Sequence, residues 1–172
     1  ERTLGELLDE AHSGTLNRIP GTAVFLHTGD DTAPLSLREN IDFNHVLHET
    51  IIITNNLRMN VPHVADEDRV TVIDLGDQWD GIWLVKLRYG FADEQNIPVG
   101  LVQAAEHHGL PFDPNTALYF LSRISVHSSK RPGMARWRKP VYVAMSHNQA
   151  DPTQYFRLPI GRTVVIGAQL FF

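Results

Sequence analysis

Apolar and polar residues alternate along several short runs of this chain, and each run has the length of a β-strand. The run 81–91 shows this most clearly, because Trp83, Val85, Leu87 and Tyr89 alternate with Leu84, Lys86 and Arg88. Alternation of this kind predicts a strand with one buried face and one partly wetted face. Further runs rich in branched and aromatic residues predict strands over 22–27, 49–56, 69–75, 117–127 and 163–172.

Between these runs, apolar residues recur every three or four positions, which is typical of helices. A helix is expected over 34–49, where Pro34 suits the first turn and Ser36 with Glu39 forms a possible capping box. A second helix should begin at Pro98 and end at Gly109, since glycine is a favourable C-cap. Residues 139–149 are also expected to be helical. The order of elements predicts a mixed α/β fold, a single domain with a central sheet of about six strands and three or four helices.

The first residues form a separate pattern. Residues 1–19 are expected to form a short amphipathic helix, with its apolar stripe at Leu4, Leu7, Leu8 and Ala11. Residues 18–21, Arg-Ile-Pro-Gly, break that pattern and are expected to act as a linker. We therefore expect an amphipathic connection over 1–19 and the α/β domain over 20–172.

Composition narrows the class of protein. The 172 residues suit one domain, and the chain has no cysteine, which excludes disulfides and thiolate metal sites and fits a reducing, cytoplasmic location. No apolar run approaches the roughly 20 residues needed to cross a bilayer. The acidic, amphipathic start does not resemble a signal peptide. We expect a soluble domain.

Positive charge is concentrated in one segment. The net charge is −5, yet no acidic residue lies between Asp113 and Asp151. An anionic ligand or a membrane surface is therefore the expected partner of this segment, with candidate binding residues Arg123, Lys130, Arg131, Arg136, Trp137, Arg138 and Lys139. Trp137 could stack on a base. The overall acidic character, with a pI near 6.0, disfavours nucleic acid. A solvated, solubilising loop is the alternative.

Two histidines three residues apart, His45 and His48, precede Glu49 and would share one face of the expected helix. A His-based metallohydrolase would need a third ligand from His27, His63, or the pair His107 and His108. The HExxH arrangement is absent, so we favour His48 as a residue that caps the C-terminus of the helix.

Other sites are not indicated by the sequence. No P-loop, dinucleotide fingerprint, EF-hand or GxSxG elbow is present, and the acidic runs Asp30-Asp31 and Asp66-Glu67-Asp68 are best explained as solvated turns. Ser128-Ser129-Lys130 lacks the SxxK spacing. We therefore expect no catalysis, no metal and no cofactor.

Several stretches resemble the cytoplasmic C-terminal domain of the Kup (KT/HAK) family of potassium uptake proteins. They are IPGTAVFLHTGDD, NHVLHE followed by IIIT, RYGFADEQNIP, GLPFDPNTALYFLSR, PGMARWR and QYFRLPIGRTVVIGAQLFF, in order from Ile19 to Phe172. Two departures stand out. Phe43 and His45 occupy positions where histidine and lysine are common in relatives, which argues against a fixed two-histidine ligand set. Ile124 replaces a usual acidic residue, which leaves Arg123 freer to meet an anion.

The resemblance implies a secondary potassium transporter with proton symport, whose membrane portion of about twelve helices handles both ions. It implies a location on the cytoplasmic side of the inner membrane, as part of a multi-pass membrane protein. For this domain it implies a regulatory and assembly role without catalysis, and a homodimer is expected. Some relatives bind a cyclic dinucleotide, so a nucleotide-sensing module that uses the basic segment 123–139 is the alternative.

Overall fold

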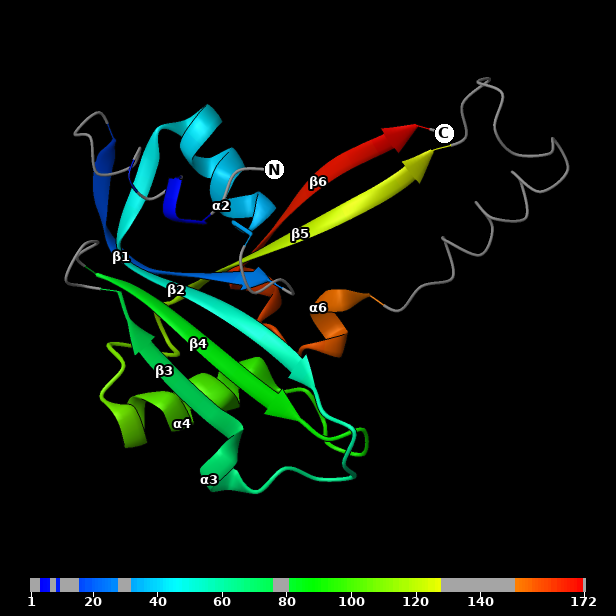
Figure 1. The fold of residues 1–172 in the computed structure, drawn as a ribbon. Helices are drawn as coiled ribbons and strands as arrows, with labels where there is room; N and C mark the ends of the chain where they lie inside the picture. The colour runs from blue at the N-terminus through cyan, green and yellow to red at the C-terminus, as the bar shows by residue number, and fades with distance from the viewer. Residues whose placement is uncertain are drawn as a thin grey trace, which may run out of the picture.

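The chain forms one six-stranded sheet (Figure 1). The computed structural model describes residues 4–6, 9, 16–27, 32–75, 81–127 and 151–171. Neighbouring strands in the order β3-β4-β2-β1-β5-β6 are parallel, except that β3 is antiparallel to β4. The mixed α/β fold with about six strands is thereby confirmed. The strand bounds are β1 Asn17–His27, β2 Val46–Arg58, β3 Val70–Asp74, β4 Ile82–Tyr89, β5 Leu118–His127 and β6 Thr163–Phe171.

Helices cover both faces of this sheet (Figure 1). On one face lies α4, and on the other lies α2, which continues directly into a π-helical turn, η1. Short helical turns complete the described structure. The bounds are α2 Leu35–Glu39, η1 Asn40–Asn44, α3 Asp66–Arg69, α4 Ile97–His108, α6 Pro152–Tyr155 and η2 Ile160–Arg162.

The two central strands, β1 and β2, are buried on both faces, as a parallel sheet requires. Val24 and Ile52 point into the core under α4, while Phe25 and Ile53 point into the core under α2. All four are at most 1% exposed. Burial of each such side chain contributes about 1.5–3 kcal/mol, so these strands hold the two layers of helices together.

The limits of α4 follow from its sequence. Asn96 is the N-cap, and its side-chain oxygen accepts a hydrogen bond from the backbone N–H of Val99 at 3.2 Å. Gly109 is the C-cap, with a left-handed φ of 68° that glycine adopts without steric cost. The expected helix from Pro98 to Gly109 is confirmed, beginning one residue earlier at Ile97.

The helix expected over 34–49 is wrong in its second half. Helical structure ends at Asn44, and His45 adopts a left-handed φ of 52°. β2 then begins at Val46, which pairs with Asn17 of β1. The side chain of Asn40 donates to the backbone oxygen of Val46 at 3.0 Å and so fixes the turn. Pairing with β1 has overridden the helical spacing of the apolar residues.

The linker expected over 18–21 is also wrong. β1 begins at Asn17 and its pairing with β2 runs through this segment, with an irregularity between Ile19 and Thr22. Pro20, which has no N–H to donate, and Gly21, with φ of 115°, lie within that irregularity, where both residues are tolerated. The boundary at 19/20 stays a prediction.

Two other expected helices are described only in part. Of the helix expected over 1–19, residues 4–6 and 9 are helical, whereas 17–19 belong to β1. The helix expected over 139–149 lies outside the described residues.

The loops after β2 and β4 lie against each other at a glycine. Backbone bonds join Met59 N to Tyr89 O at 2.8 Å and Phe91 N to Val61 O at 2.9 Å. A Cβ atom added at Gly90 would lie 2.2 Å from the carbonyl oxygen of Pro62. The close approach of these two backbones therefore requires glycine at position 90.

We predict that Gly90→Ala lowers the free energy of unfolding by about 2 kcal/mol or more, because backbone rather than a flexible side chain must move. Gly161→Ala is the control, since nothing lies within 4 Å of its added Cβ. That control should change stability by less than about 0.5 kcal/mol. Urea denaturation of both variants is the measurement, and equal stabilities would contradict the predicted backbone contact.

Candidate functional site

The carboxyl edge of the parallel strands is where α/β folds place their ligands. From β1 the chain goes to β2 and later to β4 on one side, whereas β5 and β6 lie on the other side of β1. The direction in which strands are added therefore reverses between β1 and β5. This switch point is the candidate functional site of the fold.

A row of polar side chains crosses the sheet beside this switch point. His27, the last residue of β1, pairs in register with Asn55 of β2, which pairs with Lys86 of β4. By strand alternation all three lie on the face that carries Phe25 and Ile53. Asn55 is 1% exposed, and His27 Nε2 lies 2.9 Å from Thr32 Oγ1. An imidazole, an amide and an ammonium group are thus aligned across three neighbouring strands.

These groups have the chemistry to bind an anion. Imidazole and amide groups donate hydrogen bonds, and the ammonium group supplies a positive charge. Neither Asn55 nor Lys86 was among the residues predicted from the sequence. Each lies near other polar residues of its strand, such as Asn56 and Arg88, so no sequence signal separates it from them.

The predicted basic binding residues are only partly described. Arg123 lies on β5, exposed, and pairs in register with Gly167 of β6. The structure therefore places Arg123 on the ribbon formed by β5 and β6. Outside the described residues are Lys130, Arg131, Arg136, Trp137, Arg138 and Lys139.

His45 and His48 do not lie on one face of a helix as the sequence predicts. His45 is the exposed residue with left-handed backbone, and His48 lies in β2. The predicted capping of a helix C-terminus by His48 is therefore wrong. Among the residues that the structure describes, no group of three histidine, aspartate or glutamate side chains could hold a metal ion.

His48 instead packs inside the domain. It is 5% exposed, and its ring lies edge-on to that of Phe120 with a centroid distance of 5.8 Å. Burial lowers the pKa of His48 below the usual histidine value, because the charged imidazolium is poorly solvated there. The neutral form is thus favoured, as suits a core histidine.

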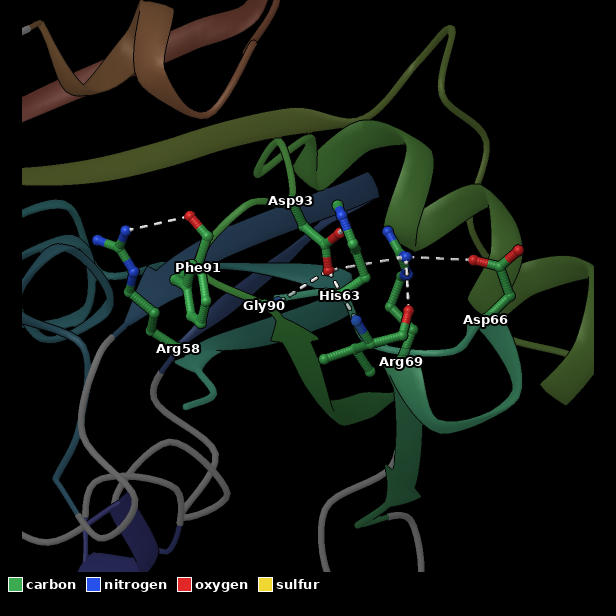
Figure 2. A network of polar contacts seen from close by, with 8 residues as sticks. Arg58, His63, Asp66, Arg69, Gly90, Phe91 and Asp93 are labelled. Carbon is green, nitrogen blue, oxygen red and sulfur yellow. Dashed lines mark hydrogen bonds and ion pairs between the residues drawn. The ribbon is translucent and has the colours of Figure 1, made fainter. Parts of the chain in front are cut away.

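A second polar cluster lies around Asp93, in the loop after β4 (Figure 2). One carboxylate oxygen accepts hydrogen bonds from the backbone N–H of Gly90 at 2.8 Å and of Val64 at 3.0 Å. The other oxygen lies 2.6 Å from His63 Nδ1. The bonds from Val64, His63 and Gly90 hold the pKa of Asp93 far below its usual range. The carboxylate therefore joins two loops that are distant in the sequence.

Arg69, in α3, extends this cluster (Figure 2). It pairs with Asp66 at 3.2 Å, donates to the carbonyl of Val64 at 2.9 Å and lies over the ring of Tyr89. The Tyr89 hydroxyl donates to the carbonyl of Asn96, the N-cap of α4, and burial raises the pKa of Tyr89 to about 12. The cluster links β4, α3 and α4, and we assign it a structural role.

We predict that Asp93→Asn destabilises the chain at neutral pH, since an amide cannot replace an ionised acceptor of several hydrogen bonds. The pKa of Asp93 is lower in the folded chain than in the unfolded one, so its stabilisation is present above about pH 4 and lost as the pH falls further. The unfolding midpoint of the variant should thus be several degrees below wild type at about pH 7, and the difference should be smaller at about pH 3, where part of the stabilisation has been lost.

Glu94→Gln is the matched control, because the Glu94 side chain is 74% exposed and pairs with the exposed Arg157. Its midpoint should stay close to wild type at both pH values. If the unfolding midpoint of Asp93→Asn lies equally far below wild type at both pH values, the role given to the ionised carboxylate is contradicted.

No helix of the described structure has the length and apolar composition to cross a membrane.

Comparison with known proteins identifies the family of the chain. A family model described as the K+ potassium transporter C-terminal domain matches residues 20–171. No solved structure matches the chain.

Curated relatives agree with this family. The chain is 42% identical over 171 residues to the probable potassium transport system protein Kup of Cutibacterium acnes, covering 97% of this chain and 26% of that protein. Identity is 40% over 174 residues to the protein of the same description from Rhodococcus jostii, covering 99% of this chain and 26% of the relative. The chain is 37% identical over 152 residues to the probable potassium transport system protein Kup 3 of Sinorhizobium medicae, covering 88% of this chain and 23% of that protein.

The chain thus spans about a quarter of the length of the curated relatives it matches. The family model covers the domain from the irregular part of β1 to the end of β6. Several stretches on which the resemblance rests, among them the turn after β4 that carries Asp93, lie inside this matched range. The chain belongs to the C-terminal domains of the Kup family of potassium transporters.

Proposed function

We propose that this chain is the cytosolic domain of a multi-pass potassium uptake protein of the cell membrane. The observation that carries this proposal is the match of residues 20–171 to the transporter C-terminal domain, together with relatives about four times as long that are described as potassium transport proteins. The membrane portion of the same protein would bind potassium and couple its uptake to proton symport. The domain described here would perform no catalysis.

Within that protein the domain would act in regulation and assembly. Its sheet has a packed core on each face, and its carboxyl edge carries polar groups. Such a body suits contacts with other parts of the transporter rather than passage of ions. Its partners would be the membrane portion and a second copy of the chain. Anionic lipid is a further partner, through the basic segment that follows β5.

We expect the gene that contains this chain to restore potassium uptake in a bacterium that lacks its own uptake systems. Deletion of residues 17–172 should alter the rate of uptake while the remaining protein still reaches the membrane, as judged by immunoblot. Potassium flux into washed cells is the measurement. Absence of uptake from the intact gene would contradict the transporter proposal, and an unchanged rate after the deletion would contradict the regulatory role.

A second function, sensing of an anionic nucleotide, is favoured by the polar row at the switch point. His27 ends β1 beside the switch point where α/β folds bind phosphates, and Asn55 of β2 and Lys86 of β4 continue its row across the sheet. The segment with the cations Lys130 to Lys139 follows directly on β5, the strand across the switch point. A cyclic dinucleotide, with two phosphates and two bases, fits both the positive charge and Trp137.

Isothermal titration of the chain with cyclic di-AMP and with ATP tests this function. We expect heat of binding for the cyclic dinucleotide, weakened at least about tenfold by Arg136→Gln combined with Arg138→Gln, because each lost ion pair with phosphate costs about 1 kcal/mol or more. Arg58→Gln, on the exposed end of β2, is the matched control and should bind as wild type. Flat heats for both nucleotides would end this proposal.

A further inference from the structure

The tip between η1 and β2, residues 42–45, carries the most exposed aromatic side chain of the described ranges. Phe43 is 78% exposed, compared with 55% for Phe91 and 48% for Tyr155. All four residues of the tip are exposed. A phenylalanine ring in water gains from contact with an apolar surface, so the tip is a candidate for contact with a partner.

The backbone of this tip is held in an uncommon conformation. η1 is a π-helical turn, and His45 has a left-handed φ of 52° although it is not a glycine. Asn40, which is 5% exposed, supports this conformation, because its amide donates to the carbonyl oxygen of Val46 at 3.0 Å and accepts from Asn44 at 2.9 Å. Turns of this kind are frequent at functional sites. The ring is thus presented by a fixed support.

The tip lies beside the place where the chain enters the sheet. β1 begins at Asn17, whose backbone N–H donates to the carbonyl oxygen of His45 at 3.1 Å. The matched family domain is a C-terminal one and the curated relatives are about four times as long, so the larger part of such a transporter precedes β1. Figure 1 shows β2 running from this tip to the opposite end of the sheet. The tip is therefore at the end that receives the chain from that larger part.

Negative charge surrounds the tip. From Glu39 to Glu49 the chain has three acidic residues, the third being Asp42, and neither lysine nor arginine. Arg18 of β1 pairs in register with Leu47 and is one cation beside them, so acidic groups remain in the majority. The anionic headgroups of the inner leaflet repel such a surface. Short cytoplasmic loops of membrane proteins carry an excess of lysine and arginine, and these loops are complementary to it.

We propose that Phe43 docks on the cytoplasmic loops of the membrane portion of the same protein, with the exposed Asp42 and Glu49 facing their basic residues. The ring supplies apolar contact, and the carboxylates select a basic surface. Because Asn40 already holds the tip in shape, little conformational freedom is lost on docking. This inference rests on the proposed function and identifies the surface through which the domain would meet the membrane portion.

Photo-cross-linking of the full-length protein in its membrane is the first test. Phe43→p-benzoylphenylalanine keeps an aromatic ring at the tip, and irradiation should join it to a peptide of the membrane portion, identified by mass spectrometry. Phe91→p-benzoylphenylalanine is the matched control, exposed beyond the far end of β2. It should give at least about tenfold less of this adduct, because the length of a strand separates the two positions. Adducts of position 43 with lipid alone, or with nothing, would overturn the proposal.

Charge reversal is the second test and leaves the ring in place. Glu49→Lys should lower the yield of the adduct from position 43 several-fold at low ionic strength, because lysine repels loops rich in lysine and arginine. Glu67→Lys is the matched control, since Glu67 is equally an exposed acid but lies in α3, which follows the far end of β2. Its yield should equal that of wild type. Equal yields for Glu49→Lys and Glu67→Lys contradict the proposed docking on basic loops.

Potassium uptake by the same cells separates this inference from the function on which it rests. Uptake together with an adduct between position 43 and the membrane portion supports the proposal. Uptake without that adduct overturns docking through Phe43 and leaves the transporter proposal standing. Absence of uptake from the intact gene overturns both.

Discussion

The structure depends on the burial of β1 and β2 on both faces. Val24 and Ile52 fill the core under α4, and Phe25 and Ile53 fill the core under α2. Because both faces are apolar, helices must lie above and below, and the connections between strands must cross the sheet. This constraint leaves the ends of the strands as the places where polar groups can gather. His27 lies at the end of β1, and Asn55 pairs with it from the second half of β2.

The two polar clusters at the strand ends differ in what they do. Around Asp93 the carboxylate is saturated by backbone N–H groups and His63, and its lowered pKa keeps it charged in a fixed geometry. Such a group stabilises loops and has little capacity left for a ligand. The row of His27, Asn55 and Lys86 begins next to the switch point of the sheet, the place where α/β folds bind ligands, and this position makes it the candidate for recognition of an anion.

The family match covers the strands and loops that carry these features, because it extends over residues 20–171. In this chain the double core fixes the shape of the domain, and the carboxyl edge between β1 and β5 is the candidate place for contact with a ligand.

Local pattern by itself determined most of the elements. Alternating or continuous apolar runs located the strands, and Pro98 with Gly109 located α4, because strand and helix periods and caps are properties of neighbouring residues. Tertiary structure decided the rest. The helix before β2 stops at Asn44 because Val46 pairs with Asn17, and Asp93 meets Val64 because two loops close on Gly90. Register and loop contact join residues far apart in the chain, and no local period encodes them.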